Sequence, residues 1–190
     1  MDPPGLLPVP NRGVVIAIDG AMSTGKTTLF RAIQSEFGDR LVYVPEAARE
    51  VAPDFGISTI DDWAPLLNDP VRLEHFFVRE ERWLTEQLDK PLPCLVDSSH
   101  YVIAAYRRHF GAGAPSPFDS SRYALILYCP PTFDASTDGF RFTDGRASVD
   151  RYLTQLLAAT TIPQISMVAG ALRLPRALTA IDDLLTRSHC

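Results

Sequence analysis

The feature that most constrains this chain is the stretch Gly20-Ala21-Met22-Ser23-Thr24-Gly25-Lys26-Thr27, which matches the phosphate-binding loop pattern G-x-x-x-x-G-K-[ST]. A short β-branched run, Val14-Val15-Ile16-Ala17-Ile18, precedes it and predicts a buried parallel strand. A helix is expected to follow from Lys26 to about Phe37, where Gly38 gives a C-terminal signal. A strand, a glycine-rich loop and a helix in this order predict a nucleoside triphosphate site.

The residue types of the loop suit phosphate chemistry. Gly20 and Gly25 allow successive backbone N–H groups to turn inward at the positive end of the helix. Lys26 is expected to reach the β- and γ-phosphates, and the hydroxyl of Thr27 to hold Mg²⁺. Lys26 is also one of two lysines in a chain of sixteen arginines. The expected ATP-binding set in the loop is Gly20, Ala21, Met22, Ser23, Thr24, Gly25, Lys26, Thr27 and Thr28.

Length and composition bound the rest of the molecule. With 190 residues and 46% hydrophobic content, the chain fits one domain over residues 13–190, preceded by a flexible proline-rich arm over residues 1–12. A net charge of −5 argues against nucleic acid as a partner. We find neither a membrane-spanning apolar stretch nor a leader, and the three scattered cysteines read as buried thiols, so we expect a cytoplasmic protein without a membrane partner. The sequence leaves a homodimer open.

Strands and helices alternate along the chain, which predicts an α/β fold of the P-loop NTPase type. We expect a doubly wound, five-stranded, mostly parallel sheet with helices on both faces, giving three α/β/α layers. The strands are expected at residues 14–18, 41–44, 93–97, 123–128 and 165–169. The helices are expected at residues 26–37, 70–88, 101–110, 149–159 and 176–187, with an aromatic and leucine stripe on the second that reads as core or lid packing.

Asp97 ends the expected third strand, where P-loop enzymes place a carboxylate that handles Mg²⁺ or the acceptor hydroxyl. It is expected to flank the metal with Thr27, directly or through water, or to accept the substrate proton. The competing interpretation is an N-cap for the next helix, but Ser98 or Ser99 can supply that cap. His100 follows closely and is read as a surface or packing residue, because the histidines show no ligand spacing.

Glu46 and Arg49 follow the expected second strand. Because ligands of doubly wound sheets gather beyond the carboxyl ends of the strands, both are expected to face the crevice beside the loop and bind substrate. Three residues apart on a starting helix, a carboxylate and a guanidinium can share a face. The alternative for Glu46 is a first-turn acid that complements the helix dipole.

Two further segments complete the predicted site. A polar, glycine-containing segment over residues 132–148 is where kinases of this architecture carry a lid, and Arg141 and Arg146 are expected to close over the transferring phosphoryl group. The alternative is a solvated loop. Gly170, after the fifth strand, is expected to let the adenine ring approach the backbone, although it also suits a plain turn.

Taken together, the loop, the run Pro45-Glu46-Ala47-Ala48-Arg49-Glu50, Asp97, and Asp138-Gly139-Phe140-Arg141 resemble the nicotinamide riboside kinase-like group of P-loop proteins, which are also described as small AAA-type ATPases. The resemblance spans residues 14–185 and extends more distantly to nucleoside and nucleotide kinases. It implies a kinase of a nucleoside-like acceptor. The run Asp97-Ser98-Ser99-His100 departs from the Asp-Thr-Asp type sequence of nicotinamide riboside kinases, which leaves the acceptor open.

The sequence thus predicts an ATP- and Mg²⁺-dependent kinase that phosphorylates a hydroxyl of a small nucleoside-like or polyhydroxylated metabolite. Lys26, Asp97, Glu46, Arg141 and Arg146 form the expected catalytic set. The alternative is a regulatory ATPase that responds to a macromolecular partner. The preference between ATP and GTP and the choice between Asp97 and Glu46 as base stay open.

Overall fold

A computed structural model describes residues 13–90, 93–132, 134, 140 and 145–187 of this chain. Within these residues, five strands form one parallel sheet in the order β2-β3-β1-β4-β5. The bounds of the strands are β1 Val15–Asp19, β2 Val42–Val44, β3 Cys94–Asp97, β4 Tyr123–Tyr128 and β5 Gln164–Ser166. The predicted fold class is confirmed, and every strand pair in the described sheet is parallel.

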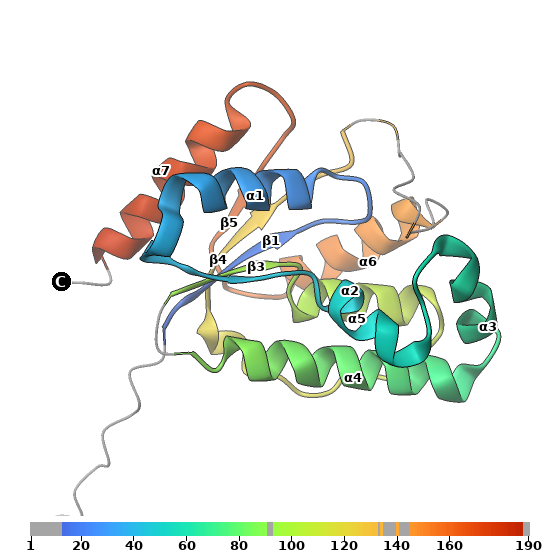
Figure 1. The fold of residues 1–190 in the computed structure, drawn as a ribbon. Helices are drawn as coiled ribbons and strands as arrows, with labels where there is room; N and C mark the ends of the chain where they lie inside the picture. The colour runs from blue at the N-terminus through green and yellow to red at the C-terminus, as the bar shows by residue number, and fades with distance from the viewer. Residues whose placement is uncertain (1–12, 91–92, 133, 135–139, 141–144, 188–190) are drawn as a thin grey trace, which may run out of the picture.

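Helices cover both faces of the sheet (Figure 1), so its strands are buried on each side. One face carries α1 Lys26–Phe37 and α7 Arg173–Arg187, and the other is covered mainly by α4 Pro70–Leu88, α5 His100–His109 and α6 Arg146–Ala158. Two short helices, α2 Ala47–Val51 and α3 Trp63–Leu67, connect β2 to α4. Short 3₁₀ turns lie at Gly38–Arg40, Ala52–Phe55, Ile60–Asp62 and Ser120–Arg122.

The alternation of side chains along β1 divides the core into two layers. Val15 and Ala17 pack in the layer under α4 and α5, whereas Ile16 and Ile18 pack in the layer under α1 and α7. The aromatic stripe of α4, predicted as packing, lies in the first layer with Phe76 and Phe77 buried.

The register of the central strands determines where the site forms. Ile18 of β1 pairs with Asp97 of β3, so the carboxyl ends of these two strands meet at one edge of the sheet. The loop that leaves β1 therefore starts beside Asp97. This is the edge at which doubly wound sheets bind their ligands.

Several element boundaries differ from the sequence prediction. β5 stops at Ser166 rather than residue 169, because its partner β4 runs into Pro130 and Pro131, which follow Cys129 and cannot donate ladder hydrogen bonds. Helix α6 begins three residues earlier than expected, after Gly145, which has a left-handed φ of 85°. Helix α3 was not predicted; five residues are too few for a periodic pattern.

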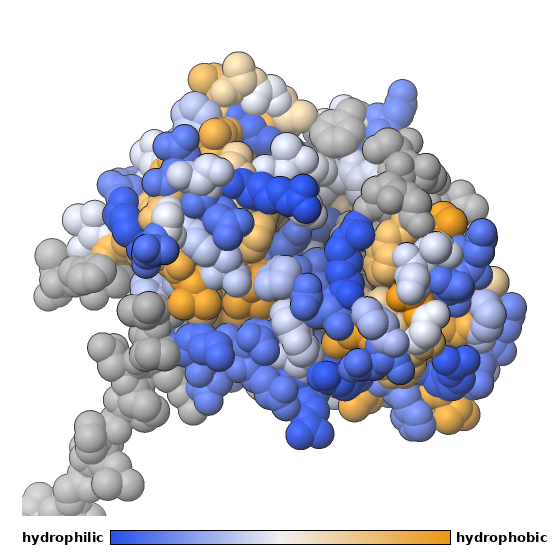
Figure 2. Space-filling model, in the orientation of Figure 1, coloured by the Kyte–Doolittle hydropathy of each residue, from blue (hydrophilic) through white to orange (hydrophobic). Residues whose placement is uncertain are grey.

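Few large apolar side chains are exposed on the described surface. Figure 2 shows one face on which polar side chains dominate and apolar ones are scattered. The large apolar side chains that are exposed within the described residues are Val71, Val78, Val168 and Leu172. None of the described helices combines the length and the apolar character needed to cross a membrane. The predicted arm over residues 1–12 and the terminal Cys190 lie outside the described residues, whereas Cys94 and Cys129 are buried as predicted.

Candidate active site

The loop between β1 and α1 has the backbone geometry that its sequence predicts. Gly20 has a φ of +159°, and a Cβ placed on it would lie 2.5 Å from the backbone oxygen of Cys129. Gly25 caps α1 in the left-handed region with a φ of 75°. Ser23 also has a positive φ, 55°, which is uncommon for a residue with a side chain and often marks a functional turn. The first turn of α1 therefore opens onto the loop with its N–H groups available to an anion.

The side chain of Lys26 contacts the backbone of the phosphate-binding loop. Its side chain is buried, and Nζ donates a hydrogen bond to the carbonyl oxygen of Ala21 at 2.8 Å. Thr24 donates to the same carbonyl from Oγ1 at 2.9 Å. The ammonium group is thus held at the loop by a neutral partner, which a phosphate oxygen can replace.

Asp97 and Thr27 meet as predicted. The hydroxyl of Thr27 donates to Oδ2 of Asp97 at 2.7 Å, and Asp97 is 2% exposed. Its other oxygen, Oδ1, is buried and has no hydrogen-bond partner among the described residues. Burial raises the pKa of Asp97, while the nearby Lys26 and the Thr27 hydrogen bond oppose this rise. An acceptor atom buried beside a phosphate loop without a donor indicates a place for a ligand.

The N-cap interpretation of Asp97 is wrong, because Ser99 caps α5 instead. The hydroxyl oxygen of Ser99 accepts a hydrogen bond from the N–H of Tyr101 at 3.1 Å. Ser99 in turn is held by Asp19, a buried residue that sequence reasoning missed. The carboxylate of Asp19 accepts from the N–H of Ser99 at 2.9 Å and from its hydroxyl at 2.6 Å. Because Asp19 directly precedes Gly20, these bonds tie the loop to the segment that follows Asp97.

The environment of Asp19 shifts its titration. Burial raises the pKa of Asp19 to about 6, although the two hydrogen bonds from Ser99 oppose this change. Asp19 could have been recognised from the sequence, because it is a carboxylate at the end of an apolar strand, as Asp97 is.

Glu46 and Arg49 face the same crevice, as predicted. Nε of Arg49 donates to Oε2 of Glu46 at 3.2 Å, and both residues line a cleft of about 710 Å³ together with Lys26, Thr27 and Asp97. Glu46 stands just before α2, and its side chain makes no capping hydrogen bond to that helix. No capping hydrogen bond therefore supports the helix-dipole alternative for Glu46, whereas its ion pair with Arg49 is formed.

Two arginines attach to the carbonyl groups of the loop. Nη2 of Arg146, at the start of α6, donates to the oxygen of Ser23 at 3.1 Å. Nη2 of Arg173, at the start of α7, donates to the oxygen of Thr24 at 2.9 Å. Arg146 was predicted as a lid residue, whereas Arg173 was missed because α7 was expected to begin only at Arg176. Arg141 lies outside the described residues.

Gly170 borders an open hollow of about 290 Å³ formed by the turn between β5 and α7. Its φ is +140°, and a Cβ placed there would meet nothing within 4 Å. Among the described residues no close approach requires glycine here; the positive φ by itself favours glycine, and a contact with adenine stays a prediction.

A second pocket adjoins the cleft and was not predicted. It is lined by aromatic and apolar side chains from α3, α4 and α5, and by Glu46, Glu80 and Ser98. Phe140, from the segment predicted as a lid, covers one side: its carbonyl oxygen accepts from Nε1 of Trp63 at 2.8 Å, and the guanidinium of Arg49 lies 4.6 Å from its ring centre. Within the described part of the chain, Glu46 is the one residue that lines both the cleft and this pocket.

Glu80 is the unexpected member of that pocket. Residues 73, 77, 80, 84 and 88 follow the spacing of the buried stripe of α4, so Glu80 occupies a position where an apolar side chain would be expected. A charged residue on an apolar stripe is the feature of the sequence that could have identified Glu80 as a candidate site residue. Burial and the neighbouring Glu81 raise the pKa of Glu80 to about 8, while Arg107 opposes the rise.

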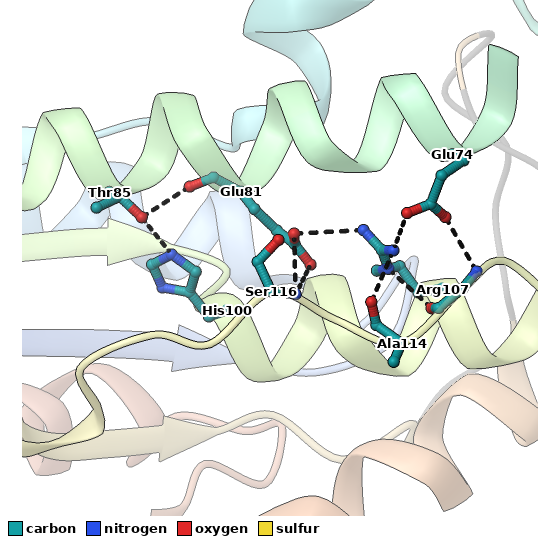
Figure 3. Close-up of polar contacts among 8 residues, drawn as sticks. Glu74, Glu81, Thr85, His100, Arg107, Ala114 and Ser116 are labelled. Carbon is teal, nitrogen blue, oxygen red and sulfur yellow. Dashed lines mark hydrogen bonds and ion pairs between the residues drawn. The ribbon is translucent and has the colours of Figure 1, made fainter. Parts of the chain in front are cut away.

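His100 has the packing role that its sequence suggested. It is buried, its ring stacks on Phe118, and Nδ1 lies 2.7 Å from the hydroxyl oxygen of Tyr123. Its Nε2 lies 3.0 Å from Oγ1 of Thr85, which itself donates to the carbonyl of Glu81 (Figure 3). Burial lowers the pKa of His100 to about 4, so the ring is neutral at physiological pH.

Figure 3 also shows a buried ionic cluster between α4 and α5 that holds the loop after α5. Arg107, 1% exposed in its side chain, forms ion pairs with Glu74 and Glu81. It also donates to the carbonyl oxygens of Gly113 at 3.1 Å and Ala114 at 2.9 Å. These contacts bind α4, α5 and the following loop to one another, which gives the cluster a structural role.

The fold and the loop define a P-loop nucleoside triphosphate-binding protein. The sequence model of the AAA domain family matches residues 15–173, and the chain belongs to this family. No curated protein shows significant sequence similarity to the chain.

Solved structures with a similar fold include kinases of small molecules. NadR protein in complex with NR superposes with a TM-score of 0.66 at 19% identity, over 90% of this chain and 51% of that one. Deoxyadenosine kinase from M. mycoides with bound dCTP gives 0.59 at 11% identity, over 90% and 100% of the two chains. Thymidylate kinase from Candida albicans gives 0.53 at 12%, over 94% and 93%.

The present chain therefore spans about half the length of the NadR chain that it resembles. At these identities the similarity shows a shared fold. It confirms, at the level of architecture, the predicted resemblance to nicotinamide riboside kinase-like proteins and to nucleoside and nucleotide kinases.

Proposed function

We propose that this chain is an ATP-dependent kinase that transfers the γ-phosphoryl group to a hydroxyl of a small nucleoside-like or otherwise polyhydroxylated metabolite. The observation that carries this proposal is the shared wall at Glu46. On one side of it lies the cleft of the phosphate loop, and on the other an apolar pocket of the kind that binds the organic part of a ligand. A donor site beside an acceptor pocket is what a kinase requires and a simple nucleotide switch does not.

The side chains at this junction match the needs of phosphoryl transfer. The loop N–H groups and Lys26 would bind the triphosphate, with the ammonium exchanging the carbonyl of Ala21 for phosphate oxygens. The acceptor oxygen would form a bond to the γ-phosphorus while the bond from that phosphorus to the β–γ bridging oxygen breaks, and ADP would leave with the bridging oxygen. The proton of the acceptor hydroxyl would pass to a carboxylate, for which Glu46 and Asp97 both stand at the cleft.

Magnesium fits the oxygen atoms present. Mg²⁺ in kinase sites is commonly held by one or two protein oxygens together with substrate phosphates and water. Thr27 and Asp97 would hold it here, directly or through water, since Oδ1 of Asp97 is buried without a donor among the described residues. When bound, the ion would neutralise charge on the β- and γ-phosphates. The described residues contain no group of three or more His, Cys, Asp or Glu that could hold a metal by itself.

The segment over residues 132–148 would act as the lid. Arg146 already contacts the loop through Ser23, and it would move from this carbonyl to the transferring phosphoryl group. Arg141, in the same segment, is proposed for the same role on sequence grounds.

The proposal is tested by measuring ADP formation from ATP and Mg²⁺ with and without a panel of nucleosides and sugars. We expect one acceptor class to stimulate turnover, and Lys26→Ala to abolish it with the thermal unfolding midpoint retained. Lys90→Ala removes the other lysine, which lies outside the cleft, and serves as the matched control.

Two results would contradict the proposal. One is turnover in Lys26→Ala equal to that of the unchanged protein. The other is ADP release that no small acceptor stimulates but a macromolecule does, which would identify a regulatory ATPase instead.

A further inference from the structure

The apolar pocket contains polar groups that nothing in the described chain satisfies. The hydroxyl of Ser98 is buried and has no hydrogen-bond partner among the described residues, and Ser98 has a left-handed φ of 80°. Glu80 is 6% exposed, and no hydrogen bond or ion pair joins it to another described residue. Buried polar groups in native proteins are nearly always paired, so two open ones in the same pocket point to a polar ligand.

The nearest cation does not neutralise Glu80 by direct pairing. The guanidinium of Arg107 is engaged by Glu74 and by Glu81, which lies 3.3 Å from Nη1. Burial among apolar side chains and the charge of Glu81 raise the pKa of Glu80 to about 8. At neutral pH its carboxyl group is therefore mostly protonated, and it offers one donor and one acceptor side by side.

The rest of the pocket suits a flat ring. Its walls include the aromatic side chains of Phe76, Phe77, Tyr106 and Phe110, with Trp63 and Phe140 on the side of the predicted lid. Aromatic walls contact the faces of a ring, which leaves the edge of the ring to the polar groups. The pocket volume is about 60 Å³, smaller than a ring, so the partly buried Trp63 and Phe140 must shift when one enters.

We propose that Glu80 is a specificity-determining residue of the acceptor site, where it pairs with the edge of a flat heteroaromatic ring that carries a hydrogen-bond donor beside an acceptor. A carboxamide or an amino group next to a ring nitrogen has this pattern, and the hydroxyl of Ser98 supplies a further contact. This inference rests on the proposed function, because it assigns the apolar pocket to the acceptor. The hydroxyl to be phosphorylated then points past Glu46 toward the phosphate loop.

Two readouts test the role of Glu80, and one of them does not depend on catalysis. Trp63 lines the pocket, so its fluorescence in a Trp83→Phe background reports ring binding directly. The ligands are adenosine and nicotinamide riboside, each compared with the matched compound that lacks the paired edge, purine riboside and pyridine riboside. The second readout is the acceptor KM in the ADP assay.

We expect at least one ligand with the edge to bind more tightly than its matched partner. Glu80→Leu should raise the Kd and acceptor KM of that ligand by about ten- to a hundredfold and abolish the preference, with the KM for ATP unchanged. Glu80→Gln should keep the preference. Above about pH 8 the unchanged protein should lose affinity as Glu80 ionises, whereas Glu80→Gln should not. Glu86→Gln, an exposed acid on the same helix, is the matched control.

The outcomes separate the two proposals. Failure of every ring compound to alter Trp63 fluorescence, or identical binding by Glu80→Leu, would overturn the inference about Glu80 even if the protein phosphorylates some acceptor. Binding that depends on Glu80 without acceptor-stimulated ADP formation would support the inference and overturn the kinase proposal.

Discussion

Two buried polar clusters lie near opposite ends of α5, and they differ in how their groups are paired. Near the end of the helix, Arg107 is surrounded by partners: two carboxylates and two backbone carbonyls. Before its start, Asp97 has one oxygen bonded to Thr27 and the other open, and the next residue, Ser98, has an open hydroxyl. Both clusters are charged and buried, so burial alone does not distinguish them.

The comparison indicates that the hydrogen-bond and ion-pair partners of a buried polar group help to distinguish a structural role from a ligand-binding role. The Arg107 cluster joins α4, α5 and the loop that follows: Nε and Nη2 make hydrogen bonds, and Nη1, which makes none among the described residues, faces the carboxylate of Glu81 in an ion pair. The Asp97 cluster keeps acceptor capacity at the edge of a cleft. A group that is expensive to bury and is left unpaired persists where a ligand completes it.

The largest expected effect comes from Asp97→Asn, which keeps the shape of the side chain and the acceptor for Thr27. Acceptor-dependent ADP formation should fall by about 1000-fold or more. Stability to urea should not fall, because burial already disfavours the charged form of Asp97. Asp69→Asn, which preserves an N-cap on α4 away from the cleft, is the control. Unchanged turnover in Asp97→Asn would make this cluster structural, like that of Arg107.

The opposite pattern is expected for Arg107→Leu. Its loss leaves Glu81 buried without its cation, and the free energy of unfolding should fall by about 3–5 kcal/mol in urea titrations. The kcat of the molecules that remain folded should be close to that of the unchanged protein. The double variant Arg107→Leu, Glu81→Leu should recover part of the loss, because it removes both charges. A drop in kcat without a loss of stability would break the distinction between the clusters.

The smallest expected effect is a pH dependence of stability caused by Glu80. Its pKa is raised from 4.5 to about 8 in the folded protein, so between these values the folded state holds a proton that the unfolded chain releases. Stability should therefore decrease as pH rises through this window and level off above about pH 8. The decrease between pH 6 and 8 should be about 2 kcal/mol by urea titration and should be smaller in Glu80→Gln. An unaltered slope in that variant would show that Glu80 is ionised throughout.

Much of the fold follows from local patterns in the sequence. The β-branched run before the loop, the proline after Asp69 and the glycine after Phe37 each mark an element that the structure contains. The residues of the loop, Asp97 and Glu46 could be placed together because parallel strands end at a common edge.

The features that the sequence did not predict depend on contacts between residues that are far apart in the chain. Helix α3 is too short to show a period, and the hydrogen bond from Ser99 to Asp19 joins residues 80 apart. Glu80 could have been recognised as a charge on an apolar stripe, but its pocket exists only after α3, α5 and Phe140 are packed around it. Sequence patterns locate the cleft of the phosphate loop better, because its lining comes from the phosphate loop with the start of α1 and from residues that directly follow or end strands.

The wall at Glu46 also has a consequence for how such proteins diversify. The cleft is built mainly from the segments after β1 and β2, whereas the apolar pocket is built mainly from α3, α4 and α5. Among the described residues the two hollows share a single side chain. In the proposed kinase, substitutions on α4 would therefore alter the ring bound in the apolar pocket and leave the triphosphate cleft unchanged, so the two parts could vary nearly independently.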